Sequence, residues 1–186
     1  KYEGHIPCEL VFQALDALPE GFTCPADRTK PWGTNHAVMM GAGVIKEPFA
    51  VINCDDFYGS DSYRVMGEFL ANLPEGAKNT YAMVGFRVGN TLSESGTVSR
   101  GLCTANDKNQ LTSVVERTKI QRMDGEVKYL DENEQWVATP DTTPASMNFW
   151  GFTPDYFEYS QEFFKTFLSD PKNMENLKSE FFIPLM

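Results

Sequence analysis

The fold prediction starts from the stretch FAVINCDD at residues 49–56. Residues 49–54 are an apolar run of strand length, which is typical of a strand buried on both faces in a parallel sheet. The run ends abruptly in Asp55 and Asp56. Ligands of open α/β sheets bind beyond the carboxyl ends of the strands, so we expect this acidic pair at a binding edge.

The segments around this strand extend it into an alternating pattern. A helix is expected to begin near Thr34, and residues 62–73 carry apolar side chains at helical spacing. Residues 80–88 are predicted to form the next strand, and residues 8–13 a short first one. The strand–helix–strand alternation predicts a mostly parallel sheet with right-handed crossovers.

The pattern changes after residue 89. Short strand-like stretches separated by polar turns predict antiparallel hairpins, followed by a strand at residues 146–153. The predicted hairpin strands are 98–104, 111–119, 126–130 and 135–138. The last segment is predicted to be helical, with an apolar stripe from Tyr156 to Leu168 and a second helix starting at Asp170-Pro171.

Composition limits the classes of protein. A chain of 186 residues with 41% hydrophobic content suits one domain, residues 1–186. The formal net charge is -10, which excludes the basic surface of a nucleic-acid-binding protein. No apolar run reaches the roughly 18 residues of a membrane span. The chain does not begin with Met or with a signal peptide, and it is expected to be cytoplasmic.

The four cysteines do not predict disulfides or a zinc site. They are far apart and form no Cys-x-x-Cys pair, so a reducing compartment is the simpler interpretation. Cys54 and Cys103 lie in strand-like runs, where a thiol is expected to pack as a small hydrophobic group.

The adjacent carboxylates of Asp55 and Asp56 suit a divalent cation. They repel each other unless a cation or hydrogen bonds offset the charge, and Mg²⁺ prefers one or two carboxylates together with phosphate oxygens and water. The alternative stays open that Asp55 caps a turn and Asp56 faces water.

A second candidate is the stretch KPWGTNHA at residues 30–37. Gly33 stands at the expected helix start, where free amides favour an anion and the missing side chain lets a base or phosphate approach. The alternatives are a simple Gly-Thr helix cap and, for His36, a structural histidine.

Several of these stretches together resemble the sugar-1-phosphate nucleotidyltransferases, which include the glucose-1-phosphate thymidylyl- and uridylyltransferases. GTNHAV at 33–38 and EPFAVINCDDFYG at 47–59 are similar to the middle of that family. GTV at 96–98, VVER at 114–117 and MNFWG at 147–151 resemble later elements in the same order. The resemblance implies an α/β fold of the Rossmann-like, GT-A type. Its mixed, mostly parallel sheet would be flanked by helices and carry an antiparallel hairpin insertion.

The resemblance also implies roles for residues of the nucleotide end. Asp55 corresponds to a catalytic metal ligand that also contacts the nucleotide, with Asp56 as a second ligand. Gln13, Gly33 and Thr34 correspond to nucleotide-binding positions, and Gln13 to a glutamine that reads a pyrimidine edge.

For the sugar end, the resemblance implies contacts from Gly96, Glu116 and Asn148. Arg117 stands where the family has a phosphate-contacting lysine, which makes it a candidate catalytic residue, although Arg differs from Lys in geometry. Without the resemblance, Gly96 is a turn residue, and Glu116 with Arg117 forms a solvated charge pair between strands.

The implied reaction transfers a nucleotidyl group from an NTP to a sugar-1-phosphate, with Mg²⁺, giving an NDP-sugar and pyrophosphate. The family's Gly-rich phosphate loop is expected before Lys1 and a second metal ligand after Met186, so the isolated chain is expected to be inactive. Two alternatives stay open: a metal-dependent glycosyltransferase of related fold, and a non-catalytic nucleotide- or sugar-binding module. The apolar end at 181–186 predicts a covering segment or association as a homo-oligomer.

Overall fold

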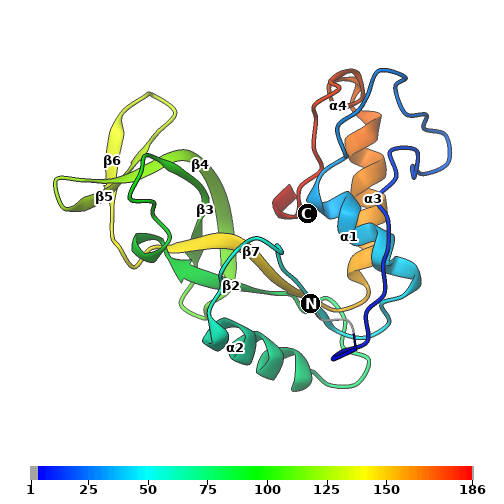
Figure 1. Cartoon of the computed structure of the whole chain (residues 1–186), viewed down its shortest axis with the longest axis horizontal. Helices are drawn as coiled ribbons and strands as arrows, with labels where there is room; N and C mark the ends of the chain where they lie inside the picture. Colours follow the sequence, from blue (N-terminus) through cyan, green and yellow to red (C-terminus); the bar gives the residue numbers. More distant parts are fainter. Residues whose placement is uncertain (1–3, 186) are drawn as a thin grey trace. The chain divides into compact units, whose positions relative to one another are not determined.

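The computed structural model describes residues 4–185 and consists of two compact units (Figure 1). Unit 1 comprises Lys1–Phe49, Pro74–Thr80 and Phe152–Met186, and unit 2 comprises Ala50–Leu73 and Tyr81–Gly151. Residues 1–3 and Met186 lie outside the described residues, and so do the parts of the predictions for the two ends of the chain that concern them. The prediction of one domain over residues 1–186 stays a prediction.

Unit 1 is built from helices around an aromatic core. Its α-helices are α1 (Thr34–Met39), α3 (Tyr156–Ser169) and α4 (Pro171–Glu175), and its 3-10 helices are η1 (Met40–Gly43) and η3 (Ile183–Leu185). Trp32, Phe164, Leu168 and Phe181 form one buried cluster of this core. Of the predicted apolar stripe, Tyr156, Phe164 and Leu168 lie on the buried side of α3, whereas Phe163 is 44% exposed. Asp170 caps α4 by accepting a hydrogen bond from the Lys172 amide.

A buried arginine ties the C-terminal segment to this core. Arg28 is 3% exposed, and its guanidinium lies 3.4 Å from the centre of the Trp32 ring. It donates to the carbonyl oxygens of Asn176 and Ser179 and to the Ser179 hydroxyl. Because these bonds satisfy carbonyls far along the chain, residues 176–181 are held against the loop before α1.

Unit 2 contains nearly all of a seven-stranded sheet. The strands are β1 (Phe49–Val51), β2 (Ala82–Arg87), β3 (Val98–Ala105), β4 (Leu111–Met123), β5 (Glu126–Leu130), β6 (Trp136–Thr139) and β7 (Pro144–Phe152). The strand order is β1-β7-β3-β4-β5-β6, and β2 also pairs with β7. The helix α2 (Ser60–Ala71) and the 3-10 helix η2 (Val88–Asn90) complete the unit.

The prediction of a mostly parallel, Rossmann-like sheet flanked by helices is wrong. The pairs β2–β7, β3–β4, β3–β7, β4–β5 and β5–β6 are antiparallel. The chain does form strand, helix and strand over residues 49–88, but β2 does not return beside β1 as a crossover unit would require. It pairs with β7 instead, so the expected βαβ unit is not closed. The predicted hairpins after residue 89 are confirmed.

Two local predictions also fail. Residues 8–13 form no strand, and Leu10 and Phe12 are 82% and 80% exposed, so nothing pairs with this segment to bury its apolar side chains. Cys54 is exposed and only Cys103 is a buried thiol, because β1 ends at Val51, before the predicted run does. All four cysteines are free.

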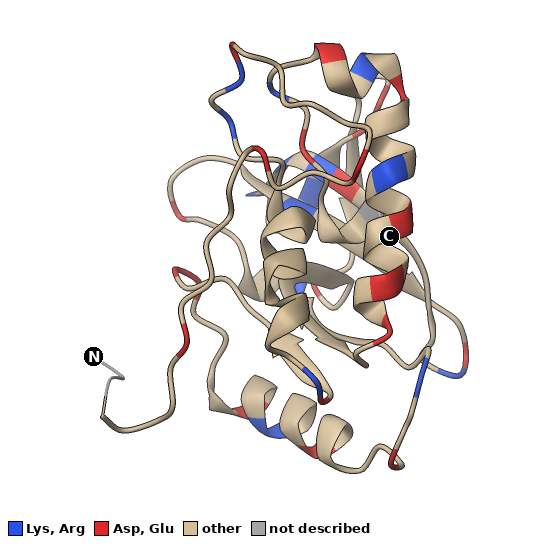
Figure 2. Ribbon diagram, turned by 90° about the vertical axis from the view of Figure 1, so that its right-hand side faces the viewer, with Lys and Arg blue, Asp and Glu red and all other residues tan. Residues whose placement is uncertain are grey.

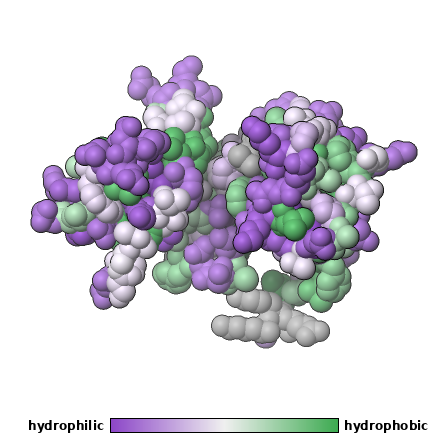
Figure 3. Space-filling view, turned by 90° about the horizontal axis from the view of Figure 1, so that it is seen from above, coloured by the Kyte–Doolittle hydropathy of each residue, from purple (hydrophilic) through white to green (hydrophobic). Residues whose placement is uncertain are grey.

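Hydrophobic and hydrophilic residues both reach the surface (Figure 3).

Unit 2 contains two separate buried clusters among the described residues. Val88, Ile120, Val127 and Ala145 form one cluster, and Tyr58, Met66 and Phe149 form the other. Met66 places α2 against β7, where a side chain on Gly151 would overlap the Met66 sulfur. The opposite side of α2 carries alternating charges (Figure 2), among them the exposed pair Arg64–Glu68. Among the described residues, no helix combines the length and apolar character needed to cross a bilayer.

Candidate functional site

The acidic pair lies in the loop that follows β1 in unit 2, and its two members have different surroundings. Asp55 is exposed, whereas Asp56 is half-buried. The Asp56 Oδ2 accepts a hydrogen bond of 2.8 Å from Asn53 Nδ2. Asp56 is therefore held by its own loop, while Asp55 leaves its carboxylate to the solvent.

Tyr58 connects this loop to the sheet. Its hydroxyl accepts a hydrogen bond of 2.9 Å from the Asn53 amide and donates one of 2.9 Å to the carbonyl oxygen of Met147 in β7. The Asp56 Oδ2 lies 3.3 Å from the same hydroxyl. Burial is the main cause that raises the pKa of Tyr58 to about 12, so the hydroxyl stays protonated and acts as a donor.

A polar row crosses β7, β3 and β4. In the sheet register Gly101 faces Ser146 of β7 on one side and Glu116 of β4 on the other. Residues that face each other across antiparallel strands share a face of the sheet, so the three residues form one row. A Cβ on Gly101 would lie 2.7 Å from Val114 Cγ1 and 3.6 Å from Glu116 Oε2, so glycine is needed here because the Val114 side chain packs against the backbone beside the carboxylate.

Glu116 keeps a carboxylate at the edge of this row. The residue is exposed, but partial burial of its carboxyl group raises the pKa of that group. The positive charge on Arg100 acts in the opposite direction and lowers this pKa. A carboxyl in this position can accept hydrogen bonds from hydroxyl groups of a ligand.

Asn148 follows two residues after Ser146 and has an unusual backbone. Its φ is 60°, a left-handed conformation that non-glycine residues adopt uncommonly and Asn more readily than most. Its amide donates a hydrogen bond of 3.3 Å to the Ser146 hydroxyl. Because the Met147 carbonyl accepts from Tyr58, Asn148 and the acidic loop lie side by side although they are distant in sequence.

Two predicted residues of the sugar end lie apart from this row. Gly96 is exposed in the turn before β3 with a φ of 88°, and a Cβ there would meet no atom within 4 Å. Arg117 faces Arg100 across the β3–β4 pair. Because successive residues of a strand point to opposite faces of the sheet, the Arg117 side chain lies on the face opposite to that of Glu116. Its guanidinium pairs with Glu132 at 2.5 Å and lies 4.6 Å from the centre of the Tyr129 ring.

The sequence prediction missed Gly101, Ser146 and Tyr58. An isolated glycine inside the strand-like stretch VSRGLCT at 98–104 is the signal that points to Gly101, because such a glycine often marks a close approach to the backbone. Ser146 and Tyr58 gave no comparable signal, since their roles depend on which strand pairs with which.

In unit 1 the structure brings Gln13, Gly33 and His36 together. The Gln13 Nε2 donates to the carbonyl oxygen of Gly33 at 3.1 Å and to Nδ1 of His36 at 3.0 Å. The other ring nitrogen of His36, Nε2, donates to the carbonyl oxygen of Ala17 at 2.8 Å. His36 is fully buried, and burial lowers the pKa of its imidazole, so it is a neutral structural histidine.

Gly33 and Thr34 are in contact with the C-terminal segment of the chain. Gly33 has a φ of 101°, and a Cβ there would lie 2.6 Å from the backbone oxygen of Phe181. The Phe181 carbonyl accepts from the Asn35 amide, and the Thr34 hydroxyl accepts from the Ile183 amide at 3.4 Å. The close approach that glycine allows here is thus made by the protein's own backbone.

The residues around Asp55 suit a metal that a ligand helps to hold. Among residues 4–185, no group of three or more His, Cys, Asp and Glu side chains is placed to hold a metal ion. Asp55 is free to bind, and Asp56 has one oxygen in hydrogen bonds. One or two carboxylates fit Mg²⁺ that takes its other ligands from phosphate oxygens and water.

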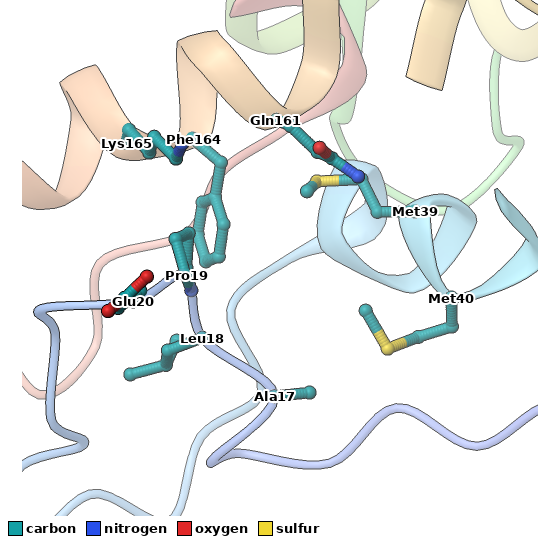
Figure 4. A pocket seen from close by; sticks show the side chains of 9 residues that line it. All are labelled: Ala17, Leu18, Pro19, Glu20, Met39, Met40, Gln161, Phe164 and Lys165. Atoms are coloured by element: carbon teal, nitrogen blue, oxygen red, sulfur yellow. The ribbon is translucent and has the colours of Figure 1, made fainter. Parts of the chain in front are cut away.

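A separate cavity of about 360 Å³ lies within unit 1 (Figure 4). Met39 and Met40 line one side, and Gln161, Phe164 and Lys165 of α3 line another, above the loop at residues 17–20. The predicted site residues do not line it.

Comparison with known proteins adds no family. The sequence matches no protein-family model, and no curated protein matches it well enough to count as a relative.

Proposed function

We propose that this chain is part of a sugar nucleotidyltransferase, which transfers a nucleotidyl group from an NTP to a sugar-1-phosphate and forms an NDP-sugar and pyrophosphate. The proposal starts from the resemblance of residues 33–38, 47–59 and 114–117, which occur in the family's order.

One structural observation supports it most strongly. The Tyr58 hydroxyl bonds to the Met147 carbonyl, so the loop of the candidate metal ligand Asp55 lies beside the candidate sugar ligand Asn148. Ser146, two residues before Asn148, continues into the row with Gly101 and Glu116. A carboxylate for a cation and a polar row for hydroxyl groups therefore occur in one unit.

Within unit 2 the residues have distinct proposed roles. Asp55 would hold Mg²⁺ with help from Asp56, and the ion when bound supplies positive charge to phosphate oxygens. Glu116 would accept hydrogen bonds from sugar hydroxyls, and Asn148 would contact the sugar. Catalysis in such transfers depends mainly on positioning and charge stabilisation, which these groups can provide.

In unit 1 the proposal keeps Gln13 as the contact to the nucleotide base, because Gly33 packs against the Phe181 backbone and the Thr34 hydroxyl accepts from Ile183. The Gln13 amide nitrogen is already used by Gly33 and His36, so its carbonyl oxygen is the atom left for a ligand. An acceptor at this position suits an N–H group on the edge of a base.

The test is calorimetric titration of the 186-residue chain with glucose-1-phosphate and with UTP, each with and without Mg²⁺. We expect Asp55→Asn to remove the dependence of binding on Mg²⁺. Glu116→Gln should weaken the binding of glucose-1-phosphate by about ten-fold, which is the effect of losing one charged hydrogen bond. The matched controls are Asp107→Asn in the β3–β4 turn and Glu126→Gln at the start of β5, both at exposed positions, which should bind as the wild type does.

Two results would contradict the proposal. One is a wild-type chain that binds neither compound. The other is metal-independent binding that Asp55→Asn leaves intact, which would favour a non-catalytic binding module. Hydrolysis of UDP-glucose would favour the glycosyltransferase alternative.

A further inference from the structure

The Tyr58 hydroxyl makes contacts to two segments that are far apart in sequence. On one side are the Asn53 amide at 2.9 Å and the Asp56 Oδ2 at 3.3 Å, both in the loop that carries Asp55. On the other side is the Met147 carbonyl at 2.9 Å. Since Asn53 Nδ2 also bonds to Asp56, the acidic loop is closed around this one hydroxyl.

The peptide group between Met147 and Asn148 is fixed at both of its polar ends. Its carbonyl accepts from Tyr58, and its N–H donates to the Ser146 hydroxyl. This peptide leads into the left-handed backbone of Asn148. A left-handed backbone costs energy in a non-glycine residue, and these two hydrogen bonds fix the peptide that leads into it.

The ring of Tyr58 gives its hydroxyl a fixed position. The residue is 5% exposed, and its ring centre lies 5.0 Å from that of Phe149 and 5.8 Å from that of Phe86. The Tyr58 carbonyl accepts a hydrogen bond of 2.7 Å from the Ser62 hydroxyl at the start of α2. The hydroxyl therefore cannot follow either segment if one of them moves.

We propose that Tyr58 is a positioning residue that couples the metal-binding carboxylate of Asp55 to the sugar-contacting side chain of Asn148. This inference rests on the proposed function, because it assigns Tyr58 to the site that the proposal describes. Without the hydroxyl the acidic loop and the Met147–Asn148 peptide lose their common partner, and both halves of the site lose their orientation together.

The test variant is Tyr58→Phe, which keeps the ring in the core and removes only the hydroxyl. Tyr63→Phe is the matched control, since its ring contacts Phe149 at 5.2 Å and it loses the same group. Val127→Ala is a second control, because Val127 is buried in the other core cluster of unit 2 and its truncation lowers stability away from the site.

The measurements are calorimetric titration with glucose-1-phosphate, with and without Mg²⁺, and the NMR signal of the Asn148 side-chain amide. We expect Tyr58→Phe to weaken the binding of glucose-1-phosphate about ten-fold or more, because a small misplacement of the groups that contact the ligand has an effect of that size. It should also remove the gain in affinity from Mg²⁺ and shift the Asn148 signal in the free protein.

The controls separate this role from general stability. Tyr63→Phe should bind as the wild type does, and Val127→Ala should melt earlier with unchanged affinity. Wild-type affinity and Mg²⁺ dependence in Tyr58→Phe would overturn the inference while leaving the proposed function intact. A wild-type chain that binds neither compound would overturn the proposed function and this inference with it, and the two failures are distinguished by the wild-type titration.

Discussion

The two units treat their candidate residues in opposite ways. In unit 1 the polar groups near Gly33 are bonded to the chain itself: Gln13 to Gly33 and His36, and Thr34 to Ile183. In unit 2 the candidate acids Asp55 and Glu116 are both exposed. The candidate residues of unit 1 therefore hold the fold together, whereas those of unit 2 leave their carboxylates available to a ligand.

This difference teaches how to interpret a glycine or a histidine in a motif. Gly33 and His36 are required by close packing and by a buried hydrogen-bond chain, whatever else they do. Substitutions in unit 1 should therefore change stability first, and substitutions in the unit 2 row should change ligand affinity first.

The largest expected effect comes from Gly33→Ala in unit 1. The new Cβ would lie under 3 Å from the Phe181 backbone, at a φ of 101° that alanine tolerates poorly. Backbone strain and overlap together should lower the free energy of unfolding by about 4 kcal/mol, as measured by urea denaturation. Gly43→Ala is the control, since a Cβ there meets open space. If Gly33→Ala were as stable as the wild type, the contrast between the units would fail.

The next effect is expected from Arg28→Met. The substitution keeps much of the side-chain volume over Trp32 but leaves the carbonyls of Asn176 and Ser179 without their donor. Loss of buried, charge-assisted hydrogen bonds should lower the free energy of unfolding by about 2–4 kcal/mol.

The control for Arg28 is its neighbour Lys30, measured by the same denaturation experiment. Lys30 pairs with Glu180 at 2.5 Å, but its side chain is 43% exposed. Lys30→Met should therefore cost only about 0.5 kcal/mol. Equal losses in Arg28→Met and Lys30→Met would mean that the buried cation does not fasten the C-terminal segment.

A smaller effect should be visible as a dependence of stability on pH. Burial lowers the pKa of His36 in the folded state, so below the unfolded pKa of about 6.5 the unfolded chain binds a proton that the folded chain does not. Stability is then fully present above that pH and falls as the pH decreases, by about 1 kcal/mol between pH 7 and 5.5.

Denaturation at several pH values checks this assignment. His36→Gln should be less stable than the wild type but should lose this part of the pH dependence, whereas His5→Gln, at an exposed position, should keep it. An unchanged pH profile in His36→Gln would show that His36 is not the buried neutral base of unit 1.

The sequence predicted local elements better than their pairing. The apolar spacing of residues 62–73 predicted α2 with both ends shifted by two residues, and Asp170-Pro171 predicted the start of α4, because helices are stabilised by near neighbours. The strand–helix–strand order of residues 49–88 did not reveal that β2 pairs with β7, since an apolar strand carries no mark of its partner. For the same reason the sequence alone did not indicate the contacts of Tyr58 and Ser146.

Candidate residues were predictable where the signal was local. Asp55 follows directly from its place after an apolar run, and its exposure agrees with a role outside the core. Gly96 was a candidate and Gly101, which lies within β3, was not, because only the register shows that Gly101 lies between Ser146 and Glu116. The role of Gly33 depended on Phe181, which is distant in sequence.

The smallest expected effect tests the contrast inside unit 2 itself. Arg117 pairs with Glu132 and covers Tyr129 on the face opposite Glu116. Since Glu132 is exposed, Arg117→Gln should move the unfolding midpoint little, and the affinity for glucose-1-phosphate should stay within about two-fold of the wild type. Titration of Arg117→Gln beside Glu116→Gln checks both residues. A ten-fold loss in Arg117→Gln would mean that its guanidinium leaves Glu132 to reach a phosphate, as the family resemblance implies, and that one face of the sheet does not define the site.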